Sequence, residues 1–439
     1  MPDTPQRVDP FLLHQFAVET EKRARILPAS VSAATGAPQE LLTALDQAVK
    51  ELSAELVEAS HDLAEHPEVA FEEHRSSSAM AELIESHGIS VTRGAYGLDT
   101  ALRAEFGDPG QPTVAILSEY DALPGIGHGC GHNIIATAGV GAFLALAAAA
   151  DQIPGRVVWM GTPAEEGGSG KELMARAGAF DDVDAAVMVH PFGYNLGESI
   201  FLGRRQLRAT FTGIASHASA QPFMGCNALD AVNLTYTGVA LHRQQMPPTD
   251  RIHGVITDGG QRPNVIPERA EILFYLRSEY PQSLKNLSQR LDDIATGAAL
   301  MTGCAVELSW DEAPPYLPLR TNQPLAAAWN RRFGDRGHAM LGPGVVPATF
   351  AGSTDFGNVS YRVPGLHAMI KIGASDLSLH TREFAAAAVS DEADAVLLDS
   401  AYGLAAVVAD YLSDQVLRND VASSFEAAGG ALDVPSYFN

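Results

Sequence analysis

Three short, apolar stretches in the first half of the chain constrain its fold more than any other feature. They are TVAIL (113–117), RVVWM (156–160) and AAVMV (185–189). Strands without polar alternation are typical of a parallel sheet that is buried on both faces. Helical patterns separate the stretches, the first of them at about residues 134–150. This alternation predicts an α/β domain with a mostly parallel sheet and helices on both of its faces.

The pattern changes near Arg204, where RQLRATFTG alternates in the manner of a half-exposed antiparallel strand. Helical patterns at about 226–244 and 284–298, with the stretches IHGVIT, AEILFYLRS and AVELSW, complete a strand–helix–strand–strand–helix–strand order. That order predicts an inserted ferredoxin-like α+β domain. The tail, about 419–439, is expected to be poorly ordered. The predicted domains are a first, larger domain of residues 1–203 and 321–439 and an inserted domain of residues 204–320.

Composition excludes several classes of partner. The 439 residues are 46 % hydrophobic and 19 % charged, as in a soluble globular protein. Acidic residues outnumber basic ones by 53 to 29, and the net charge of −24 opposes binding to nucleic acid or an anionic membrane.

Cysteine usage and the N-terminus indicate a cytoplasmic location. The chain has three cysteines, Cys130, Cys226 and Cys304, too few for a disulfide framework, so we expect a reducing compartment. The N-terminal stretch lacks a basic segment followed by an apolar run, so no signal peptide is expected. The most apolar stretch, TAGVGAFLALAAAA, is too short to span a bilayer.

Side chains of the types that bind metals follow the apolar strands. Because the carboxyl ends of parallel strands meet at one edge of a sheet, one crevice can collect them all. The side chains are Glu119, Asp121, Cys130 and His132 after the first strand, Glu165 and Glu166 after the second, His190 at the end of the third, and His380 after a later strand at 365–373.

The chemistry of these residue types favours a metal site. Thiolate, imidazole and carboxylate are the ligands that zinc prefers, and manganese or cobalt also accept such a set. Glycines between Asp121 and His132 allow the loop to bend. Glu165 and Glu166 divide between two tasks, binding a metal and accepting a proton from a metal-bound water, since adjacent carboxylates with one task would repel each other.

Two other interpretations remain open on these residues. Cys130 is a possible nucleophile with His132 as its base, but this leaves Glu166, His190 and His380 without a role. Alternatively the chain is a non-catalytic binding protein with a closed metal site, against which the second glutamate argues. Metal-reversible inactivation by a chelator distinguishes the first alternative, and metal content without hydrolysis supports the second.

Six motifs, in order between about residues 45 and 415, resemble one family. They are SEYDALPGIGHGCGHN, GTPAEEGGSGK, VMVHP, ASHASAQPFMGCNALDAV, RPNVIPERAEILFYLRS and STDFGNVSYRVPGLH. The chain is similar to the dinuclear-metal amidohydrolases related to aminoacylase, hippurate hydrolase and auxin-conjugate hydrolases, and especially to the branch that contains p-aminobenzoyl-glutamate hydrolase.

The resemblance implies a role for each matched residue. It implies Glu165 as the general base and Asp121 as the group that orients a ligand histidine. Many relatives have a histidine ligand where this chain has Glu119, so the role of Glu119 stays open. The implied ligands of two divalent ions, zinc or manganese with cobalt possible, are Cys130, His132, Glu166, His190 and His380.

The resemblance also implies roles for the inserted domain. This domain mediates dimerisation in the family, and His217 would enter the partner's active site to stabilise an oxyanion. Asn264 and Arg277 are similar to residues that hold the carboxylate of the substrate, and Asp355 and Asn358 to residues of the same cleft. The implied reaction is hydrolysis of the amide bond of N-acyl amino acids, aryl-amide conjugates or dipeptides by metal-activated water, with the acyl group and the amine undetermined.

Overall fold

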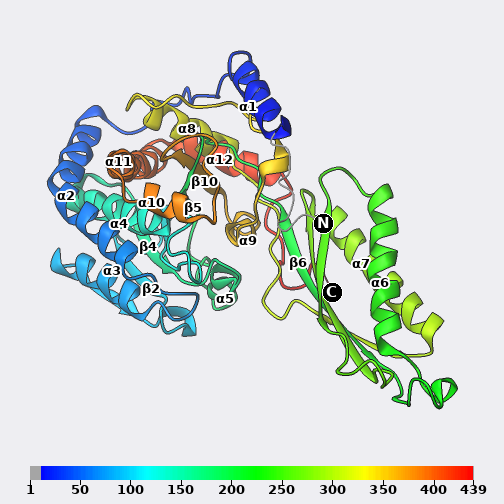
Figure 1. Cartoon of the computed structure of the whole chain (residues 1–439). Helices are drawn as coiled ribbons and strands as arrows, with labels where there is room; N and C mark the ends of the chain where they lie inside the picture. The colour runs from blue at the N-terminus through cyan, green and yellow to red at the C-terminus, as the bar shows by residue number, and fades with distance from the viewer. Residues whose placement is uncertain (1–10, 439) are drawn as a thin grey trace. The chain divides into compact units, whose positions relative to one another are not determined.

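The computed structural model of the protein describes residues 11–438, which form two compact units, each with its own hydrophobic core (Figure 1). The described part of the larger unit comprises residues up to Ser199, Arg320–Phe350 and Val359–Pro435. The smaller unit comprises Ile200–Leu319, Ala351–Asn358 and the described residues from Ser436 onward.

The larger unit is built on a six-stranded sheet with the order β1-β2-β4-β3-β5-β10. Strands β3, β4, β5 and β10 are parallel, and β1 and β2 add an antiparallel edge. The predicted mostly parallel sheet is therefore confirmed. The strands are β1 (Val91–Arg93), β2 (Leu102–Phe106), β3 (Thr113–Glu119), β4 (Arg156–Thr162), β5 (Ala185–Phe192) and β10 (Gly365–Lys371).

Three long helices cover one face of this sheet (Figure 1). They are α2 (Gln39–Glu65), α4 (His132–Ala148) and α11 (Asp391–Ser413). Helices α4 and α11 pack against the strands, and α2 packs against these two helices. Ile116 of β3 and Val187 of β5 belong to the same core as these helices. Because side chains alternate along a strand, Glu119 and His190 lie on the opposite face. The other helices of this unit are α1 (Phe11–Ala24), α3 (His74–Ser86), α5 (Gly170–Arg176), α8 (Gln323–Gly334), α10 (Arg382–Ala387) and α12 (Gln415–Ala427). The short helix α9 (Phe356–Ser360) includes residues of both units.

Helix α11 is the one described helix whose length and composition would allow it to cross a membrane. Its apolar window is 78 % buried within the protein, where the helix packs against α2, α4 and α8.

The expectation of a poorly ordered tail is wrong, because residues 415–427 form helix α12. The Asp414 side chain caps the helix by accepting hydrogen bonds from the backbone N–H groups of Val416 and Leu417. Leu417, Val421 and Phe425 recur every four residues and are buried on one helical face. Three apolar residues among polar ones give a weak pattern, and contact with α8 completes the packing.

The smaller unit is a four-stranded antiparallel sheet with the order β7-β8-β6-β9. Its helices α6 (Ala228–His242) and α7 (Pro281–Thr302) cover one face (Figure 1). The order of elements along the chain is the predicted one, and the strand order is that of a ferredoxin-like fold. The strands are β6 (Gly203–Thr212), β7 (Arg251–Asp258), β8 (Arg269–Ser278) and β9 (Ala305–Trp310).

Candidate active site

The loop between β3 and α4 turns back on itself so that Cys130 and His132 come together. The Gly131 backbone has φ +73°, and its N–H donates to the His128 carbonyl at 3.0 Å. A Cβ at Gly131 would lie only 2.7 Å from the Pro191 ring, so the position requires glycine both for its backbone conformation and for space.

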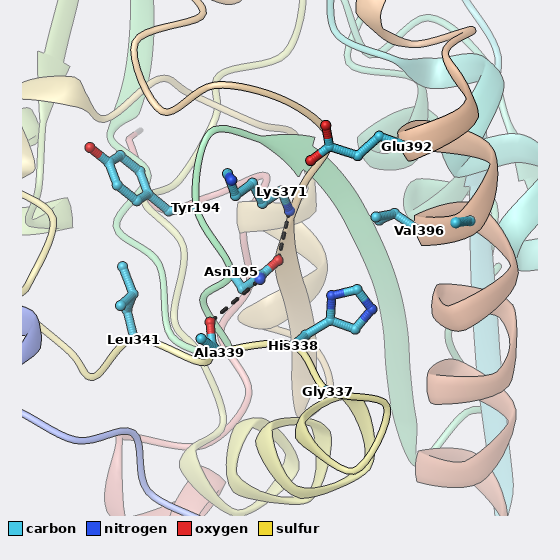
Figure 2. Close-up of a pocket in the computed structure, with 10 residues that line it drawn as sticks. Tyr194, Asn195, Gly337, His338, Ala339, Leu341, Lys371, Glu392 and Val396 are labelled. Atoms are coloured by element: carbon cyan, nitrogen blue, oxygen red, sulfur yellow. Dashed lines mark hydrogen bonds between the residues drawn. The ribbon is translucent and has the colours of Figure 1, made fainter.

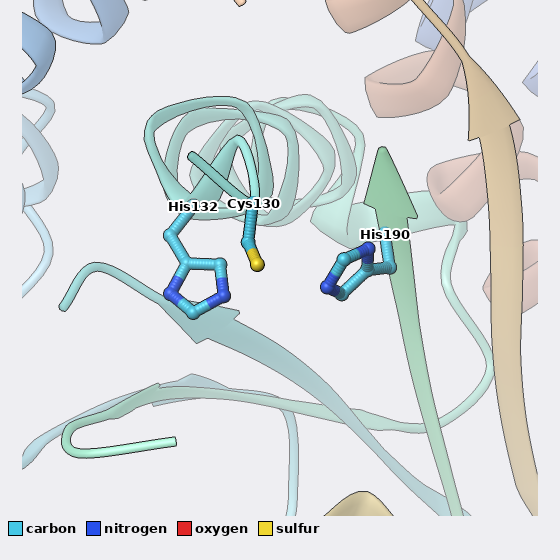
Figure 3. A group of neighbouring side chains, drawn as sticks. All are labelled: Cys130, His132 and His190. Atoms are coloured by element: carbon cyan, nitrogen blue, oxygen red, sulfur yellow. The ribbon is translucent and has the colours of Figure 1, made fainter. Parts of the chain in front are cut away.

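Ligand-type atoms from four loops meet at the carboxyl end of the sheet. Figure 3 shows the Cys130 sulfur between the imidazole rings of His132 and His190. Three overlapping groups form, in each of which one donor atom per residue lies within 4.8 Å of the others. The groups are Cys130, His132 and His190; Cys130, Glu166 and His380; and His132, Glu165 and Glu166. Two groups share Cys130, and the third joins them through His132 and Glu166.

Asp121 fixes the orientation of His132. One of its oxygens lies 3.2 Å from His132 Nδ1, and the other accepts a hydrogen bond from the Glu166 N–H at 2.8 Å. Nδ1 therefore donates to Asp121, and Nε2 is the ring nitrogen that remains for a cation. Among the described residues, this buried Nε2 and the buried Glu166 Oε1 have no hydrogen-bond partner. Two unsatisfied atoms beside a buried thiol fit a divalent cation well.

Strained backbone holds the glutamate loop and the His380 loop in place. Ala164, just before Glu165, has φ +58°, and its N–H donates to the buried carboxylate of Glu73 at 2.9 Å. His380 has φ +62°, and its N–H donates to the Gly129 carbonyl at 3.0 Å. Non-glycine residues adopt this conformation only where the surrounding structure enforces it, which is common at functional sites.

Burial sets the protonation of the groups near this centre. It lowers the pKa of His190 to about 4, so the ring is neutral and able to bind a cation. Burial raises the pKa of the Cys130 thiol, which opposes a free thiolate and therefore a cysteine nucleophile. For Asp121 burial acts to raise the pKa, but hydrogen bonding and the charge of His132 lower it overall.

The smaller unit carries His217 and Asn264 in two adjoining loops. His217 is exposed, and its Nδ1 accepts hydrogen bonds from the N–H groups of Ser219 and Ala220 at 3.3 and 3.2 Å. The neutral ring therefore carries its proton on Nε2, which is free to donate to an oxyanion. The Asn264 carbonyl accepts from the Ala218 N–H at 3.1 Å, and the Asn264 side chain is exposed.

Arg277 stands in a row of three arginines. In the sheet register it lies opposite Arg204 on β6 and Arg251 on β7, so the three side chains share a face. The Arg204 guanidinium lies 5.1 Å from the Tyr275 ring centroid and 4.1 Å from that of Tyr316, without an ion pair among the described residues. Like charges opposite each other in a sheet are unfavourable, so the row favours an anionic ligand.

The two remaining cleft residues are placed within the smaller unit. Asn358 binds the backbone there, accepting from the Leu317 N–H at 2.6 Å and donating to the Pro315 carbonyl at 2.8 Å. Asp355 is fully buried. Asn358 therefore holds a loop of its own unit.

Sequence reasoning missed two residues that lie beside the metal-ligand cluster. Lys171 is fully buried and pairs with Glu119, and His367 is fully buried with its ring stacked on His190 at 5.5 Å. The signal for His367 was a histidine inside an otherwise apolar strand. A single lysine at the start of a short helix gave no such signal.

A pocket of about 490 Å³ in the larger unit contains none of the candidate ligands among its described lining residues. Figure 2 shows the Asn195 side chain accepting a hydrogen bond from the Lys371 N–H and donating one to the Ala339 carbonyl, and Lys371 and Glu392 are both lining residues. Because none of the candidate ligands is among the described lining residues, we assign the pocket no part in catalysis.

Comparison with known proteins identifies the family. A model of peptidase family M20/M25/M40 matches residues 115–402. A mouse Xaa-Arg dipeptidase is 37 % identical over 417 residues, which cover 91 % of this chain and 95 % of the relative. One of the subunits of p-aminobenzoyl-glutamate hydrolase from Escherichia coli strain K12 is 38 % identical over 305 residues, or 64 % of this chain and 63 % of the relative.

Solved structures share the fold. A dinuclear metal-binding M20 peptidase from Bacillus subtilis superposes with a TM-score of 0.63 at 19 % identity, covering 83 % of this chain and 99 % of that one. An aminobenzoyl-glutamate utilization protein from Klebsiella pneumoniae gives 0.64 at 20 % identity, covering 83 % and 98 %. The resemblance noted in the sequence is confirmed: the chain belongs to peptidase family M20/M25/M40 and is a metal-dependent hydrolase.

Proposed function

We propose that the protein is a cytoplasmic, homodimeric amidohydrolase that cleaves dipeptides or N-acyl amino acids with two divalent cations. The observation that supports this most is the overlap of three donor groups, two of which share Cys130 while the third contains Glu165. The five proposed ligands are Cys130, His132, Glu166, His190 and His380.

The residues around the cations divide the chemistry among them. Bound zinc, manganese or cobalt would lower the pKa of a water molecule and polarise the substrate carbonyl. Glu165 accepts the proton of the attacking water and passes it to the leaving amine. Asp121 keeps His132 in the correct orientation. The His217 Nε2–H donates to the developing oxyanion.

The substrate carries a free carboxylate in this proposal. Arg277, with Arg204 and Arg251 in register beside it, offers the positive charge that such a group needs. The relatives named Xaa-Arg dipeptidase and p-aminobenzoyl-glutamate hydrolase support a leaving amino acid with a free carboxylate. Asn264 contributes an exposed amide from the neighbouring loop.

A homodimer is supported by the surface of the smaller unit. β7 is an edge strand and exposes Val255 and Ile256, 57 % and 39 % accessible respectively. α6 exposes Tyr236 and Leu241, 41 % and 60 % accessible. An exposed apolar edge strand is able to pair with the same strand of a second copy, and in a two-fold arrangement β7 of one chain would pair with β7 of the other.

The test is a substrate panel with metal-depleted and metal-reloaded protein. The panel contains dipeptides with basic, neutral and acidic C-terminal residues, N-acyl amino acids and p-aminobenzoyl-glutamate. We expect release of the free amino acid, loss of activity with a chelator and recovery with zinc, manganese or cobalt. Absence of hydrolysis across the panel by protein shown to contain metal would favour the non-catalytic alternative.

A further inference from the structure

Lys171 and Glu119 form an ion pair beside the cluster of donor groups, and both side chains are 0 % exposed. Lys171 Nζ lies 2.5 Å from Glu119 Oε1. Removing a lysine from water is costly, and a buried pair returns little net stability over apolar residues of the same size. Stability alone therefore explains the pair poorly.

The second oxygen of Glu119 faces the metal-ligand cluster. Oε2 lies 3.5 Å from His132 Nε2, the nitrogen that has no hydrogen-bond partner among the described residues. Two donors bound to one zinc ion at about 2.0–2.1 Å in a tetrahedral arrangement lie roughly 3.4 Å apart. The separation of Oε2 and Nε2 therefore suits two ligands of the same cation.

The two carboxylates beside His132 have different surroundings. Asp121 contacts Nδ1 and receives the backbone N–H of Glu166, so it has no oxygen to give a cation. Among the residues that the structure describes, Glu119 is held by Lys171 through Oε1, and its Oε2 faces only His132 Nε2. Glu119 is thus the carboxylate able to act as a ligand, and Lys171 restricts it to a single oxygen.

Resting on the proposed function, we infer that Glu119 is a one-oxygen ligand of the cation at His132, and that Lys171 is a positioning residue. Lys171 holds Oε1 and reduces the negative charge that the cation experiences. Without the lysine, both oxygens of Glu119 are available to the cation, and the negative charge of Glu119 is no longer offset by a neighbouring positive charge. The cation at His132 should then bind more tightly and be less suited to polarising water or substrate.

The experiment measures metal affinity and thermal stability. Metal per chain is determined by elemental analysis at buffered free zinc, and Tm with and without zinc, for Lys171→Met, Glu119→Gln and the double variant. We expect Lys171→Met to tighten one of two sites by at least about tenfold, to enlarge the rise in Tm on adding zinc, and to lower kcat. With Glu119→Gln present, removal of Lys171 should leave the affinity unchanged.

Further variants separate positioning from folding. Lys171→Arg should keep the wild-type affinity, and Lys171→Gln, which retains a neutral donor without the charge, should be intermediate. Lys50→Met is the matched control, since Lys50 is an exposed lysine paired with Asp46. An unchanged or weakened affinity in folded Lys171→Met protein, or a change that persists with Glu119→Gln, overturns the inference. Wild-type protein that binds no zinc would instead contradict the proposed function itself.

Discussion

Glu165 and Glu166 are adjacent in the chain but have different surroundings. The Glu166 N–H is held by Asp121, and its Oε1 lies 3.6 Å from His380 Nε2. Glu165 is buried and belongs to the group with His132, but to neither group that contains Cys130. This difference supports one glutamate as ligand and the other as base.

Replacing each glutamate in turn tests this division. Glu165→Gln should lower kcat by about 10²–10⁴-fold, the usual contribution of a general base, with metal content unchanged. Glu166→Gln, the matched variant at the next residue, should lose metal as well as activity. Elemental analysis beside steady-state kinetics gives both results, and full activity of Glu165→Gln would remove it from the mechanism.

The site could be anticipated in part because its ligand types follow strands whose ends must meet. Cys130, His132 and His190 were identified as candidate ligands in this way. Lys171 could not be, because whether a lysine is buried depends on packing between α5 and the sheet that no local pattern encodes. The pairing of Lys171 with Glu119 could not be predicted either, because the two residues are far apart in sequence and meet only through packing.

At the scale of elements, Glu271 links three strands of the smaller unit. Its carboxylate on β8 accepts from Thr257 on β7 and pairs with Arg208 on β6 and with Arg269. The hydrogen bond from Thr257 and the two arginines overcome burial and lower the pKa of Glu271 from 4.5 to about 2. The unfolded chain therefore binds more protons than the folded one between these values.

Glu271 should stabilise the unit above pH 4.5 and lose its contribution as the pH falls toward 2. Because Arg208 and Arg269 are partly exposed, Glu271→Gln should lower the free energy of unfolding by only about 1–2 kcal/mol at neutral pH. The difference from wild type should shrink through that window. Urea unfolding across pH measures it, with the exposed Glu307→Gln on β9 as control; a difference independent of pH would contradict the assignment.

Elements were predictable where the pattern was strong. The strands β3, β4 and β5 were found because burial on two faces leaves a continuous apolar run, and β6 was found because burial on one face leaves an alternating pattern. The helices α8 and α12 and the strand β2 were missed. Helix α12 and strand β2 have few apolar residues, and all three elements gain stability from contact with one another or with neighbouring elements.

At the scale of the whole molecule, the proposed homodimer would share each catalytic centre between two chains. His217 lies in the smaller unit and its ring is free to donate through Nε2, because backbone N–H groups occupy Nδ1. The five proposed metal ligands all belong to the larger unit. In a two-fold dimer each centre could take Glu165 from one copy and His217 from the other.

Mixing two inactive variants tests this arrangement. Glu165→Gln chains retain His217, and His217→Ala chains retain Glu165, so a mixed dimer contains one complete centre and one that lacks both groups. Random exchange makes half of the dimers mixed, and about a quarter of wild-type activity should return. Mixing His217→Ala chains with chains carrying both substitutions should restore nothing. Mass-tagged chains verify the exchange; if mixed dimers form and stay inactive, His217 does not act across the interface, and any contribution it makes must come within its own chain.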